Sequence, residues 1–179
     1  MILRAYRKED SGIIAGWLST EEEFYKWSAD KYAGFPLGED DIDNNYRPQM
    51  KTGRFIPLIA LDEENRIIGH FVIRYPDEKD DTSVRFAFVI VKPELRGRGY
   101  GKEMLTLGIE YVKDHLSAER IDLGVFAINK NARACYESIG FREYGRHNWQ
   151  LPVGLWECVD MEIYVDKGAA NENQEINQE

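Results

Sequence analysis

The sequence predicts an α/β (α+β) fold in which helices cover the faces of one mixed, mostly antiparallel sheet of about seven strands. Two observations lead to this prediction. The apolar positions follow strand and helix periods in the order strand, two helices, three strands, helix, strand, helix and two strands. Strands joined by short turns pair antiparallel, whereas strands joined through a helix pair parallel, so a single sheet would contain both kinds of pairing.

The N-terminal segment is predicted to form one strand and two helices. Residues 2–6 have the composition of a short strand, and a first helix can run from residue 9 to about residue 18. A second helix is predicted over residues 20–29. Thr20 is a suitable N-cap residue for it, because Glu23 follows three positions later as a capping-box partner.

The segment from residue 31 to residue 53 has no clear period. It contains four residues that interrupt regular structure, namely Gly34, Pro36, Gly38 and Pro48. We therefore expect a loop with one helical turn in this segment.

Three strands are predicted next. Residues 55–61 and 67–75 are typical of an antiparallel pair around the turn at residues 62–65. Residues 84–91 are almost entirely apolar after Arg85, as expected for a strand that is buried on both faces.

The C-terminal part of the chain adds two helices and three strands. The predicted elements are a helix at 99–116, a strand at 121–126, a helix at 129–139 that ends at Gly140, and a strand pair at 141–149 and 155–165. Residues 1–166 are expected to form one domain. Residues 167–179 are rich in Asn, Gln and Glu, which predicts a disordered acidic tail.

The composition excludes several classes of protein. The chain has 179 residues, a formal net charge of −9 and two cysteines. An acidic chain is unsuited to general nucleic-acid binding. No apolar run is long enough for a membrane span, and the N-terminus lacks the pattern of a signal peptide. We therefore expect a cytoplasmic protein that binds neither nucleic acid nor membrane. The cysteines form no metal-binding pattern, so no metal is predicted.

A glycine-rich, basic loop follows the apolar strand at 84–91. Gly97, Gly99 and Gly101 alternate with Arg98 and Tyr100 directly before a predicted helix. Helix N-termini attract anions because their first N–H groups lack partners, and glycine lets a ligand approach the backbone. A phosphate-binding loop is therefore predicted. The P-loop pattern and the dinucleotide pattern both fail here, because positions 96, 102 and 103 are Arg, Lys and Glu.

Two blocks resemble motifs of the GNAT superfamily, the GCN5-related N-acetyltransferases. The first is Arg-x-x-Gly-x-Gly at residues 96–101, after a strand that ends Val91-Lys92-Pro93. The second is Asn-x-x-Ala-x-x-x-Tyr-x-x-x-Gly-Phe at residues 129–141. The resemblance covers about residues 2–165, and the order of elements agrees with the family fold. It implies an N-acetyltransferase domain at 1–166, a splayed pair of parallel strands and acetyl-CoA as co-substrate.

The resemblance also implies roles for particular residues. Backbone N–H groups of the loop would hold the pyrophosphate of acetyl-CoA, and the strand end would pair with the pantetheine arm. Tyr136 would act as the general acid that protonates the leaving thiolate. The residues expected to contact the co-substrate are Val89, Val91, Arg96, Gly97, Arg98, Gly99, Tyr100, Gly101, Lys102, Asn129, Ala132 and Tyr136.

The general base is less clear from the sequence, because the strand at 84–91 contains neither a carboxylate nor a histidine. His70 or Glu157 is the predicted base, with Asp122 and a water relay as alternatives. His70 has the most suitable side chain for proton exchange near neutral pH.

The expected reaction is direct transfer of an acetyl group to a primary amine of a small molecule or a protein N-terminus. Aromatic residues before Phe55 and the hairpin from Trp149 to Trp156 are expected to shape the acceptor site. Acidic clusters at 21–23, 39–41 and 77–81 would suit a cationic acceptor or form solvated surface. The alternative is a GNAT-fold module that binds acyl-CoA, or another protein, without robust acetyl transfer. A homodimer is also possible through the final strands.

Overall fold

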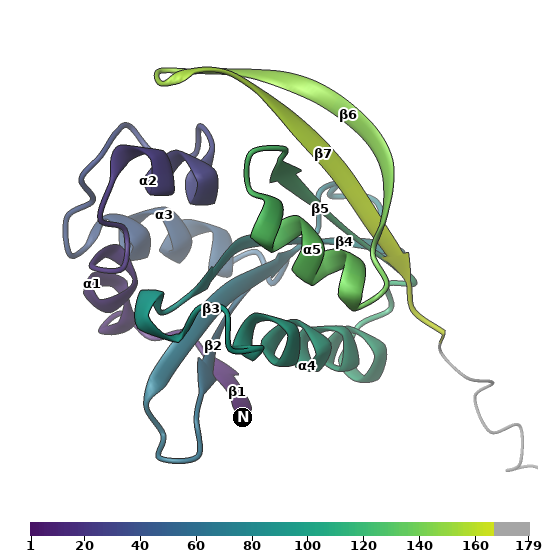
Figure 1. The fold of residues 1–179 in the computed structure, drawn as a ribbon. Coiled ribbons are helices and arrows are strands. Elements are labelled where there is room, and N and C mark those ends of the chain that lie inside the picture. Colours follow the sequence, from purple (N-terminus) through teal and green to yellow (C-terminus); the bar gives the residue numbers. More distant parts are fainter. Residues whose placement is uncertain (167–179) are drawn as a thin grey trace, which may run out of the picture.

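The seven strands form one mixed sheet in the order β1-β2-β3-β4-β5-β7-β6 (Figure 1). The computed structural model describes residues 1–166, so the tail predicted at 167–179 lies outside the described residues. In chain order the elements are β1 (Ile2–Ala5), α1 (Asp10–Ala15), α2 (Glu21–Ser28), α3 (Asp41–Met50), β2 (Phe55–Leu61), β3 (Ile67–Arg74), β4 (Ser83–Val91), α4 (Tyr100–His115), β5 (Arg120–Phe126), α5 (Lys130–Ser138), β6 (Arg142–Leu151) and β7 (Gly154–Tyr164). The predicted fold class is confirmed.

Each face of the sheet carries its own hydrophobic core. Successive side chains of a strand point to opposite faces, so Phe71 and Ile73 of β3 join one core while Val72 joins the other. The first core contains residues of α4 and α5, and the second contains residues of α1, α2 and α3. In Figure 1 the two groups of helices accordingly lie on different sides of the sheet. No helix in the described part of the chain is long and apolar enough to cross a membrane.

Strands β4 and β5 form the single parallel pair of the sheet, and they separate after three residue pairs. Their register ends at Arg85 and Asp122. The pairing of β4 with β3 then shifts between His70 and Val72, and Phe88 has a φ of 52°. Such a bulge bends the strand and increases its twist. After Arg85, Phe86 and Ile90 are buried, but Ala87, Phe88, Val89 and Val91 are only partly buried, which corrects the prediction that both faces of β4 are covered.

The helix α3 corrects a second prediction, because residues 31–53 were expected to contain only one helical turn. Ile42 and Tyr46 lie four residues apart on one face of α3 and are completely buried beneath β2. Pro48 lies inside the last turn of the helix. It removes one backbone hydrogen bond, but burial of this apolar face stabilises the helix by more than that bond would.

Candidate active site

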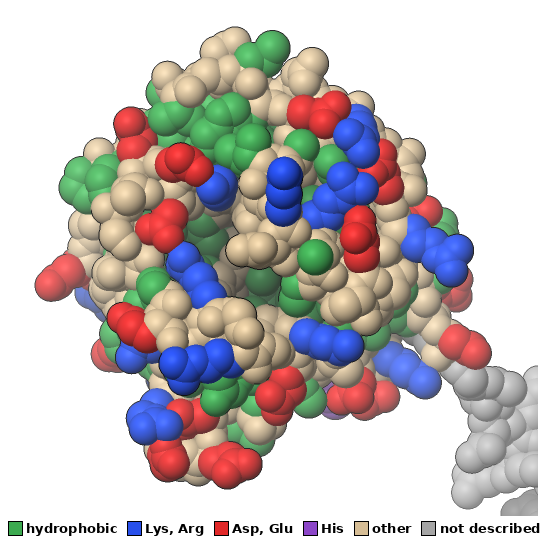
Figure 2. All heavy atoms as spheres, viewed as in Figure 1, with side chains coloured by type: hydrophobic (Ala, Val, Ile, Leu, Met, Phe, Trp, Pro, Cys, Tyr) green, Lys and Arg blue, Asp and Glu red, His purple; other side chains and the backbone are tan. Residues whose placement is uncertain are grey.

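A cavity of about 790 Å³ lies where β4 and β5 separate. We call it cavity 1. Its walls come from β4, from β5 and from the N-terminal ends of α4 and α5, and α2 closes one side. Figure 2 shows this face of the molecule hollowed near its middle, with Lys and Arg side chains at the rim. Separation of two parallel strands thus creates a slot through the sheet, open to both helical layers.

Most residues predicted to contact the co-substrate line cavity 1. They are Val89, Val91, Arg96, Gly97, Gly99, Gly101, Lys102, Asn129, Ala132 and Tyr136. Arg98 and Tyr100 are not part of the lining. Arg98 is exposed to solvent instead.

The glycine loop has the geometry of an anion site. Gly97 and Gly99 have φ values of 75° and 87°, and a Cβ added at either position would meet no atom within 4 Å. The backbone is therefore open on the side of the cavity, and α4 begins at Tyr100 with its first N–H groups directed at the loop. A pyrophosphate fits this arrangement of backbone donors and helix dipole.

Gly99→Ala is expected to weaken CoA binding about 5- to 30-fold, because an alanine at positive φ costs roughly 1–2 kcal/mol. Titration calorimetry measures this change. Gly34→Ala is the matched control, since Gly34 has no positive φ and open space around it. An unchanged affinity in Gly99→Ala would show that the loop conformation does not contribute to binding.

The Arg96 guanidinium has protein partners. Its Nη1 lies 2.7 Å from Glu23 Oε1, and its Nε donates to the Val91 carbonyl at 3.1 Å. Hydrogen bonding to Arg96 holds the pKa of Glu23 below its usual value. Arg96 therefore ties α2 to the loop, and the backbone of the loop offers the unoccupied donors.

Tyr136 projects from α5 into cavity 1. The residue is 7% exposed. Burial, together with the neighbouring Cys135 thiol, raises the pKa of Tyr136 well above its usual range. The phenol therefore keeps its proton and can donate it. Asn129 caps the same helix, because its Oδ1 accepts a hydrogen bond from the Ala132 N–H at 3.4 Å.

His70 is not brought to cavity 1. The residue is completely buried on β3. Its Nδ1 donates to the Leu58 carbonyl at 2.9 Å, so Nε2 accepts the hydrogen bond from the Tyr46 hydroxyl, also at 2.9 Å. Burial lowers the pKa of His70 to about 4. These contacts are those of a structural histidine, and His70 lies outside the lining of cavity 1, where a base would be needed.

Burial of His70 predicts a loss of stability in acid. The unfolded chain binds a proton at this residue below about pH 6.5, whereas the folded protein does so only near pH 4. The free energy of unfolding should therefore fall between these pH values, by about 3 kcal/mol at most for this group. Denaturant titrations at several pH values should give a shallower dependence for His70→Gln than for the wild type or for His115→Gln, whose histidine is exposed. Equal slopes in all three proteins would contradict the prediction.

Glu157 and Asp122 also lie outside the lining of cavity 1. Glu157 forms an ion pair with Arg146 at 3.0 Å on the exposed final hairpin. Asp122 pairs with Arg85 at 2.6 Å where β4 and β5 are still joined. Both carboxylates thus form ion pairs with arginines, and neither lines the slot.

A second cavity of about 300 Å³ adjoins the first, on the side of the sheet that carries α2 and α3. We call it cavity 2. Lys26, Trp27, Gly124 and residues 86–88 line both cavities. Gly124 faces the second cavity without a side chain, and a Cβ there would lie 3.0 Å from the Cys158 sulfur. The two cavities therefore meet at the bulge of β4.

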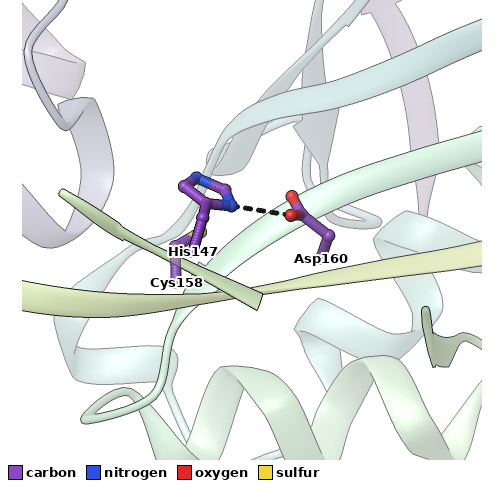
Figure 3. A group of neighbouring side chains, drawn as sticks. All are labelled: His147, Cys158 and Asp160. Atoms are coloured by element: carbon purple, nitrogen blue, oxygen red, sulfur yellow. Dashed lines mark hydrogen bonds and ion pairs between the residues drawn. The ribbon is translucent and has the colours of Figure 1, made fainter. Parts of the chain in front are cut away.

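Two residues of the final hairpin form a hydrogen-bonded pair in cavity 2 (Figure 3). The Nδ1 atom of His147 lies 2.8 Å from Asp160 Oδ2. The Trp149 indole N–H donates to His147 Nε2. Because a carboxylate only accepts, Nδ1 carries the proton and Nε2 presents its lone pair. A carboxylate-oriented imidazole of this kind can take a proton from a bound molecule.

Cys158 completes a group of three possible metal ligands with His147 and Asp160, whose ligand atoms lie within 4.8 Å of one another (Figure 3). Burial raises the pKa of the Cys158 thiol to about 11. Asp160 also accepts from Arg85 at 3.3 Å. A protonated thiol and a nearby guanidinium are poor surroundings for a cation, so the arrangement is better suited to proton transfer.

Sequence reasoning missed His147 and Asp160. They lie 13 positions apart on different strands, and only the register of β6 against β7 makes them neighbours. The sequence contains only a weak signal for this pair. Cys158 and Asp160 are two positions apart on one strand, so they share a face of the hairpin that carries Trp149.

The fold and cavity 1 define a class of protein in which two parallel strands separate and leave a cavity beside a glycine-rich loop and a helix N-terminus. The sequence model of the Acetyltransferase (GNAT) family matches residues 20–141. The chain belongs to this family.

Individual relatives agree with this assignment. Mycothiol acetyltransferase of Salinispora tropica is 29% identical over 96 residues, which are 52% of this chain and 31% of that protein. The Corynebacterium efficiens enzyme of the same name is 29% identical over 133 residues, 73% of this chain and 41% of that protein. The chain thus spans less than half the length of these relatives. The solved structure of spermidine N-acetyltransferase from Vibrio cholerae with CoA and spermine shares the fold, with a TM-score of 0.77 and 21% identity over 91% of this chain and 94% of that chain.

Proposed function

We propose that this chain is an acetyl-CoA-dependent N-acetyltransferase that transfers the acetyl group directly to a primary amine in a ternary complex. The observation that carries the proposal is the meeting of two cavities at the β4 bulge, one beside an anion-binding loop and the other beside an imidazole. Acetyl-CoA would supply an activated thioester. Direct transfer requires only that the amine reach that thioester in a suitable orientation.

Residues of cavity 1 would bind acetyl-CoA and protonate the leaving sulfur. Backbone N–H groups from Arg96 to Lys102 would bind the pyrophosphate, and the free edge of β4 would bind the amides of the pantetheine arm. Tyr136 would donate a proton to the leaving sulfur. Asn129 would hold the start of α5 in place, as its cap to Ala132 indicates.

His147 replaces His70 and Glu157 as the proposed general base. Its Nε2 lone pair would accept the proton of the amine, while Asp160 would orient the ring and stabilise the charged imidazole. In the structure Trp149 donates to Nε2. An amine entering cavity 2 would take the place of that indole N–H.

The alternative is a module that binds acyl-CoA without robust transfer. It is motivated by the absence of a carboxylate or histidine on β4 and by the occupied lone pair of His147. The exposed edge strand β6 would be the surface for a homodimer or another protein, and light scattering would detect a homodimer.

For the catalytic proposal, the spermine in the Vibrio cholerae complex makes a polyamine one class of acceptor to consider for cavity 2.

Calorimetry followed by a transfer assay tests the proposal. Acetyl-CoA should bind the purified protein, and release of CoA should depend on an added amine from a broad panel. Absence of acetyl-CoA binding would rule out the proposal. Binding without transfer to any amine would favour the alternative.

A further inference from the structure

Cavity 2 is lined by four cationic side chains and one carboxylate, in a chain whose net charge is −9. The cations are Lys26, Lys31, Arg74 and Arg85, and the carboxylate is Asp160. None of the acidic residues in the clusters at 21–23, 39–41 and 77–81 lines this cavity. A polycationic acceptor would therefore meet only one carboxylate in the lining of this cavity.

Three of the four cations already have acidic partners. Lys26 pairs with Glu22 at 2.5 Å and Lys31 with Asp30 at 2.6 Å. Arg85 pairs with Asp122 at 2.6 Å and with Asp160 at 3.3 Å. Their charges are thus largely offset within the protein.

Arg74 is different, because its guanidinium forms no hydrogen bond or ion pair with any residue between positions 1 and 166. It is half-buried at the end of β3. Its Cα pairs across the sheet with that of Arg85, so both side chains lie on the face of cavity 2. Burial, and then the charge of Arg85, lowers the pKa of Arg74. A half-buried guanidinium without a partner is an incomplete arrangement that an anion would complete.

Much of the remaining lining is aromatic, and its uncharged polar side chains are those of Ser28, Asn45, Gln49 and His147. Trp27, Phe55, Phe88, Phe126 and Trp149 contribute to its walls. Its volume of about 300 Å³ suits a small molecule. Such walls would accept an uncharged side chain next to the group that Arg74 binds.

We propose that the acceptor is a small amino acid-like amine, with a carboxylate that Arg74 binds and an apolar side chain that the aromatic walls of cavity 2 accept. The inference rests on the proposed acetyl transfer and specifies its acceptor. A planar guanidinium matches the two oxygens of a carboxylate.

Pairs of ligands that differ only in the carboxylate test this inference. Phenylalanine, leucine and methionine are compared with phenethylamine, isoamylamine and 3-methylthiopropylamine. Calorimetry is carried out on the full chain saturated with CoA, which cannot donate an acetyl group, and the transfer assay then uses acetyl-CoA. At least one amino acid should bind about 10- to 100-fold more tightly than its decarboxylated partner. Its value of kcat/KM should exceed that of the partner by a similar factor.

Arg74→Gln should abolish this preference without weakening the binding of the decarboxylated amine. Arg7→Gln is the matched control, since Arg7 is exposed and lies outside both cavities. Its preference should equal that of the wild type. Equal or tighter binding of the decarboxylated amines, a preference for spermidine, or no binding by any amino acid would overturn the inference. If CoA itself fails to bind, the proposed function fails, and this result is distinct from the others.

Discussion

Tyr136→Phe is expected to lower turnover about 100- to 10,000-fold while leaving the affinity for CoA unchanged. The substitution removes only the hydroxyl. The ring would keep its packing against Phe141, whose centroid lies 6.2 Å away. Because burial raises the pKa of the phenol, it holds its proton until the thiolate develops charge. Removal of the hydroxyl therefore raises the free energy of the transition state and leaves that of the CoA complex unchanged.

Steady-state kinetics and calorimetry together check this expectation. Tyr111→Phe is the control, because Tyr111 lies on α4 outside the lining of both cavities. It should retain wild-type turnover. A Tyr136→Phe protein with wild-type turnover would remove Tyr136 from the mechanism, and one with strongly reduced CoA affinity would assign it a binding role.

His147→Gln is expected to reduce kcat/KM for the acceptor at least about 100-fold. Glutamine can still bond to Asp160 but offers no basic nitrogen at the position of Nε2. CoA binding should be unaffected, since His147 lines only cavity 2.

His115→Gln is the control for this variant, because His115 is exposed at the end of α4, away from both cavities. Asp160→Asn should show a smaller loss of rate, since it weakens the orientation of the ring but keeps the base. A His147→Gln protein that retains the wild-type rate would exclude the imidazole as the base and favour a water relay.

The strands and most helices could be predicted because their signals are local. Thr20, for example, accepts the Glu23 N–H at 3.2 Å as an N-cap residue, as its sequence context predicts. Helix α3 could not be predicted in the same way, because Pro48 opposes it locally. Its stability comes from burial of Ile42 and Tyr46 against a strand that the sequence does not place beside it.

The two cavities of the candidate site also differ in how far apart their residues lie along the chain. The proposed CoA side, cavity 1, takes much of its lining from the contiguous segments 96–102 and 129–138, and the spacing of Gly97, Gly99, Asn129 and Tyr136 along the chain is what predicts it. The proposed acceptor side, cavity 2, is built from residues of α2, α3 and six strands, which lie far apart along the chain. No spacing along the chain relates Arg74 to Asp160 or His147.

The sequence by itself determined the fold class, the glycine loop, the capped helix that carries Tyr136 and, through them, the family. The glycine loop and the capped helix each depend on residues within a dozen or so positions, where backbone geometry relates spacing to contact. The fold class follows from the order of the predicted elements along the chain. Only the tertiary structure decided where β4 leaves β5, that His70 is buried, and that His147 and Arg74 face one cavity. Those facts follow from strand register and sheet order, which long-range packing determines across the whole domain.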